Sequence, residues 1–282
     1  MSDQDKPVWF ITGCSTGFGR ELAGATLDRG YRVVVTARRP ADVADLAVGR
    51  EARALVLQLD VTKPEEIAAA VAAAEARFGR IDVLVNNAGI GYFGAVEESD
   101  DAEVRRMFEI NFWGLANMTR AALPGMRARR SGHIVNISSM GGVRGAPGVG
   151  FYNATKFGLE GLSEALAQEL APLGITVLIV EPSGFRTDWA GRSANETQHP
   201  IADYDATAGA RRQQIRAISG KQPGDPARAA AAIIEAVEAS HAPLRLMLGK
   251  NALAAGRAKI DSMKRDFDSW AEVSEGADFP VS

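Results

Sequence analysis

The chain is poor in the residues that hold metals and cross-links. It has one cysteine, Cys14, in 282 residues, which excludes an intramolecular disulfide and a thiolate metal cluster. Its three histidines, His133, His199 and His241, lack the spacing of metal ligands or of a Ser-His-Asp triad. We therefore expect no metal site, no hydrolysis by such a triad, and a reducing compartment.

Long apolar runs and blocks of basic residues are also missing. No apolar stretch reaches the roughly 18 residues of a membrane span, and the acidic start at residues 1–6 lacks the basic and apolar regions of a signal peptide. Lys and Arg total 32 against 35 Asp and Glu, a net charge of -3, which gives no electrostatic footprint for nucleic acid. We expect a cytoplasmic protein that neither spans a membrane nor binds nucleic acid.

Short apolar runs alternate with longer helical patterns along the chain. Such runs are typical of strands buried on both faces of a parallel sheet. They occupy residues 8–12, 32–36, 54–59, 82–85, 133–138, 175–180 and 244–248. The alternation predicts an α/β fold: a doubly wound, Rossmann-type parallel sheet of about seven strands with helices on both faces.

No linker divides the chain, so we expect one domain over residues 1–282. Residues 184–224 show no strand pattern and are long for a structureless loop, which favours short helices that form a lid over a site. Residues 251–282 form a C-terminal extension, expected to be helical to about residue 270. Pro124 should kink or end the longest predicted helix, residues 102–129.

Glycine is enriched, with 29 residues, and three glycines follow the first predicted strand. Gly13, Gly17 and Gly19 lie where that strand turns into a helix. Glycines there allow a sharp turn and let a pyrophosphate approach the N–H groups of the helix N-terminus. The turn predicts a dinucleotide site, with a tight turn that binds no ligand as the alternative.

The end of the second predicted strand bears on the choice of cofactor. Sites for NAD place an acid there for the adenosine ribose, whereas sites for NADP supply an arginine for the 2′-phosphate. This chain has Arg38 there and no acid before Asp42. We expect NADP(H) to be preferred over NAD(H), because a guanidinium suits a phosphate dianion. A solvated surface arginine is the alternative.

Tyr152 and Lys156 are four residues apart and would share one face of a helix. The spacing alone is weak evidence, because solvated helix faces often show it. Its context is more specific, since Ser138 and Ser139 end the fifth predicted strand, at the sheet edge where open α/β folds bind ligands.

Together these features resemble the short-chain dehydrogenase/reductase family, in its shorter single-domain branch. The matching residues, in the family's order and spacing, are TGCSTGFG at 12–19, Asp60 and Val61, NNAG at 86–89, Asn111, Ser139, Tyr152, Lys156, and EPSG at 181–184 leading to Thr187. The resemblance is close over about residues 6–190. Ser183 and Phe18 depart from the usual Gly and small aliphatic residue.

The resemblance implies hydride transfer between a nicotinamide cofactor and a CH-OH or carbonyl group. Tyr152 would be the acid in reduction and the base in oxidation, its pKa lowered by Lys156 and the oxidised cofactor. Ser139 would donate to the substrate oxygen, and Asn111 would hold a water in a proton relay. The expected cofactor contacts are Gly13, Ser15, Thr16, Gly17, Phe18, Gly19, Arg38, Asp60, Val61, Asn87, Ala88, Gly89, Tyr152, Lys156, Pro182, Gly184, Phe185 and Thr187.

Apolar residues in the loops after the strands suggest the substrate. The expected substrate contacts are Ser139, Tyr152, Phe93, Met140, Val149 and Trp189. They favour a hydrophobic secondary alcohol and its ketone or an aldehyde. The family also implies a homodimer or homotetramer, paired through the helices that start near residues 102 and 153.

Two other functions are open to a chain with these motifs. A sugar-nucleotide epimerase or dehydratase shares the Tyr-Lys pair, but such chains are longer and have different glycine spacing. A catalytically silent NADP-binding regulator commonly loses the tyrosine or the lysine, and this chain keeps both.

Overall fold

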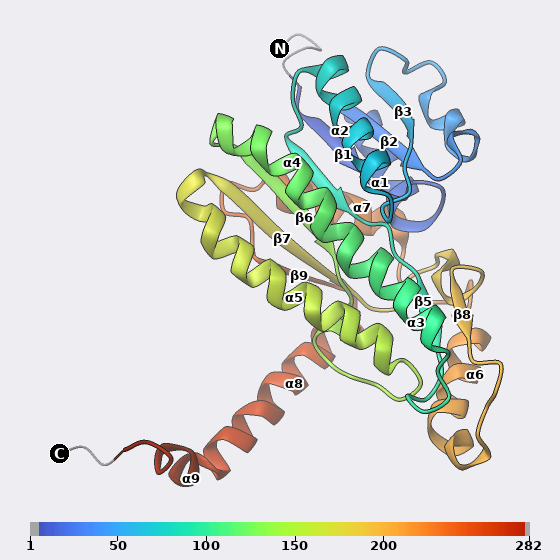
Figure 1. The fold of residues 1–282 in the computed structure, drawn as a ribbon, viewed down its shortest axis with the longest axis vertical. Coiled ribbons are helices and arrows are strands. Elements are labelled where there is room, and N and C mark those ends of the chain that lie inside the picture. Colours follow the sequence, from blue (N-terminus) through green and yellow to red (C-terminus); the bar gives the residue numbers. More distant parts are fainter. Residues whose placement is uncertain (1–5, 280–282) are drawn as a thin grey trace.

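The computed structural model describes residues 6–279, and its centre is a seven-stranded parallel sheet (Figure 1). The strand order is β3-β2-β1-β4-β6-β7-β9, so the order reverses between β1 and β4. The strands are β1 (Val8–Ile11), β2 (Arg32–Ala37), β3 (Ala54–Gln58), β4 (Val83–Asn86), β6 (Gly132–Ile137), β7 (Ile175–Pro182) and β9 (Arg245–Leu248). The predicted fold class is confirmed.

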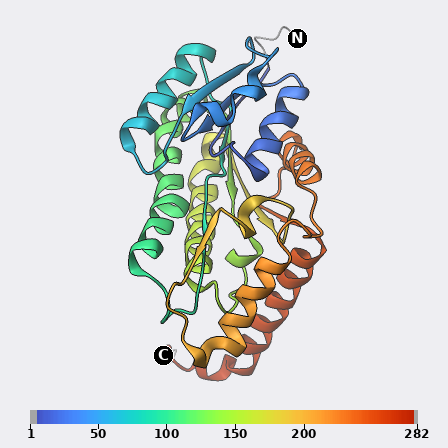
Figure 2. The same ribbon diagram turned by 90° about the vertical axis from the view of Figure 1, so that its right-hand side faces the viewer.

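Helices cover both faces of this sheet (Figure 2). Those on one face are α1 (Gly17–Asp28) and α7 (Pro226–Glu238). Those on the other face are α2 (Pro64–Phe78), α4 (Leu115–Arg129) and α5 (Gly150–Leu170). The helix α3 (Asp101–Phe108) joins α4 through a π-helical turn at Glu109–Gly114.

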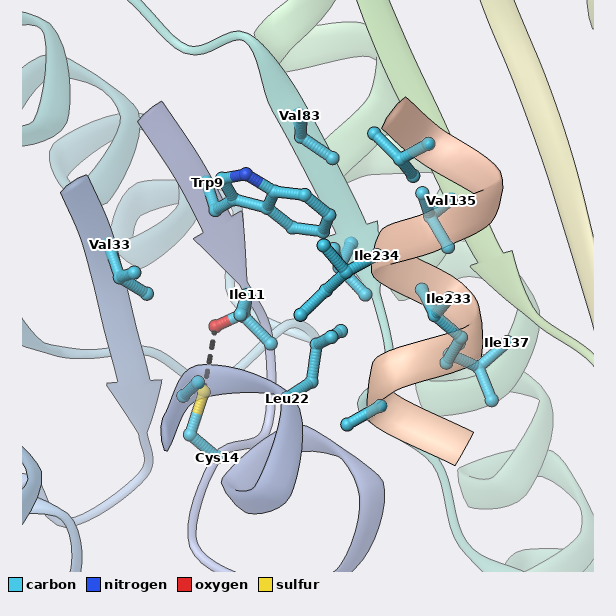
Figure 3. Packing of buried hydrophobic residues seen from close by; sticks show 14 of the residues in the cluster. Trp9, Ile11, Cys14, Leu22, Val33, Val83, Val135, Ile137, Ile233 and Ile234 are labelled. Atoms are coloured by element: carbon cyan, nitrogen blue, oxygen red, sulfur yellow. Dashed lines mark hydrogen bonds between the residues drawn. The ribbon is translucent and has the colours of Figure 1, made fainter. Parts of the chain in front are cut away.

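The strand β1 contributes to the hydrophobic cores on the two faces of the sheet. Trp9 and Ile11 point toward α1 and α7, where Figure 3 shows them packed with Leu22 and Ile234. Val8 and Phe10 alternate with them and lie in the core on the opposite face. All four residues of β1 are at most 1% exposed, and burying each large apolar side chain stabilises the fold by about 1.5–3 kcal/mol. This packing fixes the carboxyl end of β1, from which the glycine-rich turn starts.

Two features of the helices depend on single residues. The carboxylate of Asp225 accepts hydrogen bonds from the backbone N–H of Ala227 and Arg228 and so caps α7. The expectation that the long helix could end near Pro124 is wrong, because α4 continues to Arg129. The buried Met126 lies after the proline, and its packing helps to offset the hydrogen bond that proline cannot donate.

Residues 184–224 contain short helices, as expected, and also a strand that the sequence pattern did not reveal. The strand β8 (Ala194–Glu196) pairs in parallel with β5 (Gly91–Phe93), and α6 (Ala210–Ala217) follows. A three-residue strand is too short to show the alternation from which strands are predicted. The pairing attaches this segment to the loop after β4.

The chain ends in α8 (Lys250–Ser269) and α9 (Ala271–Glu275), which project from the body as an arm (Figure 1). The extent of α8 agrees with the helix expected from residue 251 to about residue 270. Within residues 6–279, none of the helices combines the length and the apolar character that a membrane crossing requires.

Candidate active site

The glycine-rich turn between β1 and α1 is held by the loop that follows β4. The hydroxyl of Thr12 accepts hydrogen bonds from the backbone N–H of Asn87 and Ala88, and the amide of Asn87 donates to the carbonyls of Thr12 and Gly13 at 2.8 and 2.9 Å. Two of the predicted cofactor motifs therefore form one structural unit.

This close contact leaves no space for side chains at two glycines. A Cβ at Gly19 would lie 2.4 Å from the Asn87 side-chain nitrogen and 2.4 Å from the Gly13 carbonyl oxygen. Gly13 has φ +70°, a conformation that other residues adopt at a cost, and a Cβ there would lie 3.0 Å from Ala88 Cα. The turn needs glycine at these positions whether or not a ligand is present.

An open pocket of about 370 Å³ lies on the outer side of this turn. Its lining residues are Ser15, Thr16, Gly17, Arg20, Glu21, Arg186, Thr187, Asp188, Ser219, Gly220 and Pro226. Thr16 is the N-cap residue of α1, and its side chain makes no capping hydrogen bond. The first backbone N–H groups of α1 are therefore without a side-chain cap beside the hydroxyls and arginines of the pocket, a set of donors that suits a phosphate.

Arg38 and Asp60 lie at the carboxyl ends of neighbouring strands, β2 and β3. Arg38 is exposed. Burial alone would raise the pKa of Asp60, but hydrogen bonds from Thr62 and the charges of Lys63 and Arg38 outweigh it and lower that pKa. Val61, by contrast, is 6% exposed and packs in the core on the α2 side of the sheet. The side chain of Val61 is therefore part of the core.

Four other expected cofactor contacts gather around the end of β7. Pro182 is the last residue of β7, and Gly184 lies next to Gln222. The rings of Phe18 and Phe185 meet edge to face with centroids 5.0 Å apart. Phe185 is 9% exposed, so this aromatic pair also fills the space between α1 and the end of β7.

Ser139, Tyr152 and Lys156 come together at the carboxyl end of the sheet. Tyr152 and Lys156 lie one turn apart on α5, with the lysine Nζ 5.9 Å from the centre of the tyrosine ring. Ser139 follows β6 and is a hydrogen-bond neighbour of the Tyr152 hydroxyl. Ser138, the alternative that the sequence pattern left open, instead bonds the carboxylate of Glu160. The geometry favours Ser139.

The environment of this group shifts both pKa values. Burial raises the pKa of Tyr152 to about 12, although the bond with Ser139 lowers it in part. In the protein alone the loss of solvent dominates, so the lowering of the Tyr152 pKa expected from Lys156 together with the oxidised cofactor stays a prediction. Burial also lowers the pKa of Lys156 to about 8, against the opposing effect of Glu160. The lysine Nζ donates to the Ile137 carbonyl at 2.7 Å.

Asn111 lies in the π-helical turn and is 1% exposed. Its side-chain oxygen accepts from the backbone N–H of Ile90, and its two amide hydrogens are used by the Ile90 carbonyl and the Thr155 hydroxyl. The side chain thus joins the loop after β4 to the helix that carries Tyr152. It has no amide hydrogen left to donate to a water.

Aromatic side chains cover Tyr152. The ring of Trp189 lies 4.9 Å from that of Tyr152 and 5.4 Å from that of Phe93. Phe93 and Val149 are 0% and 6% exposed and belong to the same apolar cluster as Tyr152. Met140 begins the short helix after Ser139. The expected substrate contacts therefore gather around the tyrosine, mostly beneath a closed cover.

Sequence reasoning did not find Arg216, which anchors this cover. From α6 its guanidinium donates to the carbonyls of Ala190, Gly191 and Ala194 at 2.7–3.1 Å, and it lies 4.8 Å from the centre of the Phe93 ring. It thereby fixes the segment that carries Trp189. No motif marks it, because its partners are more than 20 residues away.

A partly buried charged cluster next to Lys156 was also not predicted. Arg245 on β9 pairs with Glu160, Glu164 and Glu181. Burial and the neighbouring Glu160 raise the pKa of Glu181 to about 7, although Arg245 opposes the shift. Strand pairing brings these residues together, and no local spacing predicts it.

Comparison with known proteins agrees with this geometry. The family model for short chain dehydrogenase matches residues 7–198. The chain belongs to the short-chain dehydrogenase/reductase family. It is therefore an oxidoreductase, and the recognition made from its motifs is confirmed.

Three relatives illustrate the range of similarity. A 3-ketodihydrosphingosine reductase of Bacteroides thetaiotaomicron is 38% identical over 86% of this chain and 87% of its own. A short-chain dehydrogenase structure from Streptomyces avermitilis has a TM-score of 0.92 and 46% identity, and covers 99% of this chain and 100% of its own. A family member from Burkholderia phymatum, solved with NAD, has a TM-score of 0.80 and 25% identity over all of both chains.

Proposed function

We propose that this protein is an NADP(H)-dependent oxidoreductase that interconverts a hydrophobic secondary alcohol and its ketone, or reduces an aldehyde. One observation carries the proposal: Ser139, Tyr152 and Lys156 meet beneath an aromatic cover, on the sheet edge that also holds the glycine-lined pocket. The relative solved with NAD supports a nicotinamide cofactor.

The residues of the pocket fit such a cofactor. The uncapped N-terminus of α1, with Ser15, Thr16 and Gly17, would hold the pyrophosphate, and Thr187 would contact the nicotinamide end. Asp60 would meet the adenine, and Arg38 the 2′-phosphate. When bound, the nicotinamide supplies or accepts the hydride.

Tyr152 is suited to act as an acid in carbonyl reduction. Burial raises its pKa to about 12, so the hydroxyl is protonated at neutral pH, which is the form that reduction requires. Ser139 would donate a hydrogen bond to the substrate oxygen, where negative charge develops. In alcohol oxidation, a positively charged environment would have to lower this pKa before Tyr152 could act as a base.

Lys156 and Asn111 would serve the proton path. Lys156 would bond the cofactor ribose and lies one turn from Tyr152. We keep Asn111 as the residue that holds a relay water, and we assign this task to its backbone or its side-chain oxygen, since both amide hydrogens are already used. The π-helical turn that contains it supports this role, because such turns often occur at functional sites.

The substrate class follows from the cover over Tyr152. Trp189, Phe93 and Val149 belong to the apolar cluster that contains Tyr152, and apolar walls with a few polar groups are typical of sites for hydrophobic small molecules. We propose that residues 184–224 act as a lid that opens at Trp189 within a single domain. The reductase named for 3-ketodihydrosphingosine shows that a relative acts on a carbonyl compound.

We further propose a homodimer or homotetramer in the cytoplasm. Trp113, in the turn between α3 and α4, and Phe157, on α5, are exposed and offer apolar surface for pairing. The one cysteine, Cys14, is buried and has a pKa raised to about 12, so it is unreactive and compatible with a reducing compartment.

The test is a panel of apolar ketones, aldehydes and secondary alcohols, assayed by the absorbance of the reduced nicotinamide. We expect turnover with several hydrophobic members and a higher kcat/KM with NADPH than with NADH. Tight cofactor binding without turnover of any member would instead favour the silent regulator.

A further inference from the structure

The C-terminal arm carries a continuous apolar stripe that the described chain leaves uncovered. Six large apolar side chains of α8 and α9 are between 40% and 66% exposed: Leu253, Ile260, Met263, Phe267, Trp270 and Val273. Only Ala252 and Gly256, near the start of α8, are buried, where Gly256 lies against Met247 of β9. The rest of the arm extends away from the body (Figure 1).

The spacing of these residues is typical of a helix that packs against another helix. Leu253, Ile260 and Phe267 are seven residues apart, and Met263 and Trp270 repeat the same interval three residues further on. This is the a and d pattern of a coiled coil, which places all five side chains on one face. A face of this kind on an extended arm would expose apolar area to water unless a partner covers it.

The charges of the arm are divided between its two halves. Residues 250–265 contain five basic residues and Asp261, a net charge of about +4, whereas residues 266–275 contain four acids and no base, about -4. This order opposes the helix dipole, which favours acids at the N-terminus and bases at the C-terminus. The described arm has one internal ion pair, between Lys264 and Asp268. The division is unfavourable for a lone helix and favourable for an antiparallel partner with the same sequence.

We propose that the arm docks on the arm of a second copy of this chain, antiparallel to it. In the register that pairs each a position with a d position, Ile260 faces Met263 of the second copy and Leu253 faces Trp270. The acidic half of each arm then lies beside Lys250 and Arg257 of the other arm. A lipid surface is a poorer occupant, because an anionic membrane would repel the acidic half. This interface is separate from the α4 and α5 faces and does not depend on the catalytic proposal.

The first test is the mass of the assembly in solution, measured by light scattering on the full chain. Ile260→Asp combined with Phe267→Asp should halve the wild-type mass, because two charges enter the apolar stripe of each arm. Val48→Asp, at an exposed valine outside the arm, is the control and should leave the mass unchanged. Thermal unfolding of the double variant checks that the body is intact. A monomeric wild type, or an unchanged mass in an intact double variant, overturns the proposal.

The second test determines the direction of pairing. Single cysteines are introduced into the arm and cross-linked with a short bifunctional maleimide, and the native Cys14 does not interfere because it is buried. Antiparallel arms place Met263→Cys close to its copy. They separate Leu253→Cys from its copy by about 25 Å, or 17 residues at 1.5 Å each. Cross-linking at residue 263 alone supports the proposal, and equal cross-linking at both positions overturns it. Flotation with phosphatidylserine and phosphatidylcholine vesicles completes the test, since stripe-dependent binding to vesicles by a monomer would identify a lipid occupant.

Discussion

At the scale of single residues, Lys156 combines a charge with deep burial. Its side chain is 6% exposed, and its ammonium donates to one backbone carbonyl, that of Ile137. The cost of removing the charge from water appears as a pKa lowered to about 8. The site therefore keeps this lysine charged at neutral pH at the expense of stability.

The stability of the cofactor-free protein should depend on pH through Lys156. Between pH 8 and 10.5 the folded chain releases this proton while the unfolded chain holds it, so stability rises with pH. We expect wild type to gain up to about 3 kcal/mol relative to Lys156→Met across this range, at 1.36 kcal/mol per pH unit. Urea unfolding of both proteins at several pH values measures the difference. A constant difference would contradict the effect of burial.

Arg38 should determine the choice between the two nicotinamide cofactors. Removing a charge-assisted bond to a phosphate costs about 1.5–3 kcal/mol. Arg38→Asp should therefore lower kcat/KM for NADPH by roughly 10- to 150-fold and favour NADH, because the new carboxylate suits the free ribose. The control is Arg39→Asp, since Arg39 already pairs with Asp42 and its side chain is 80% exposed. Equal effects of the two substitutions would show that Arg38 does not bind the 2′-phosphate.

At the scale of elements, the glycine-rich turn and the loop after β4 depend on each other for their shape. Gly19→Ala should destabilise the fold by about 1–3 kcal/mol, because the added Cβ would meet Asn87 and the Gly13 carbonyl at 2.4 Å. Gly24→Ala is the matched control on the same helix, with no atom within 4 Å of its Cβ. It should raise stability by about 0.5–1 kcal/mol.

Thermal unfolding and cofactor titration of the two glycine variants measure these effects. If Gly19→Ala and Gly24→Ala have the same melting temperature, the turn tolerates a side chain and the contact with Asn87 is not restrictive.

The sequence predicted those elements whose signal is local. All seven strands of the main sheet were found, because each is an apolar run between helical patterns, and the motifs at the strand ends lie on one sheet edge. The strand β8 and the anchor Arg216 were missed, and the continuation of α4 past Pro124 was left open. Each depends on tertiary packing rather than on neighbours in the sequence. The burial of Tyr152, which raises its pKa, could not be predicted either, since the sequence does not show that the ring of Trp189 lies against it.

At the scale of the whole molecule, the sheet holds the reacting groups and the segment after β7 covers them. Strands β1, β4 and β6 end at the glycine-rich turn, the Asn87 loop and Ser139, while Tyr152 enters from α5. Trp189 closes over this group from a segment fixed by β8 and Arg216. The arm lies outside this arrangement, so assembly and catalysis can be tested separately.

The central claim is that the Tyr152 hydroxyl transfers the proton that accompanies the hydride. The most direct measurement compares steady-state turnover and cofactor affinity in wild type and Tyr152→Phe, with Tyr31→Phe, far from the pocket, as the control. The account predicts that Tyr152→Phe lowers kcat at least about 100-fold, within the range for general acid–base catalysis, while Kd for NADPH and the activity of Tyr31→Phe stay near wild type. Near-native turnover in Tyr152→Phe would contradict it.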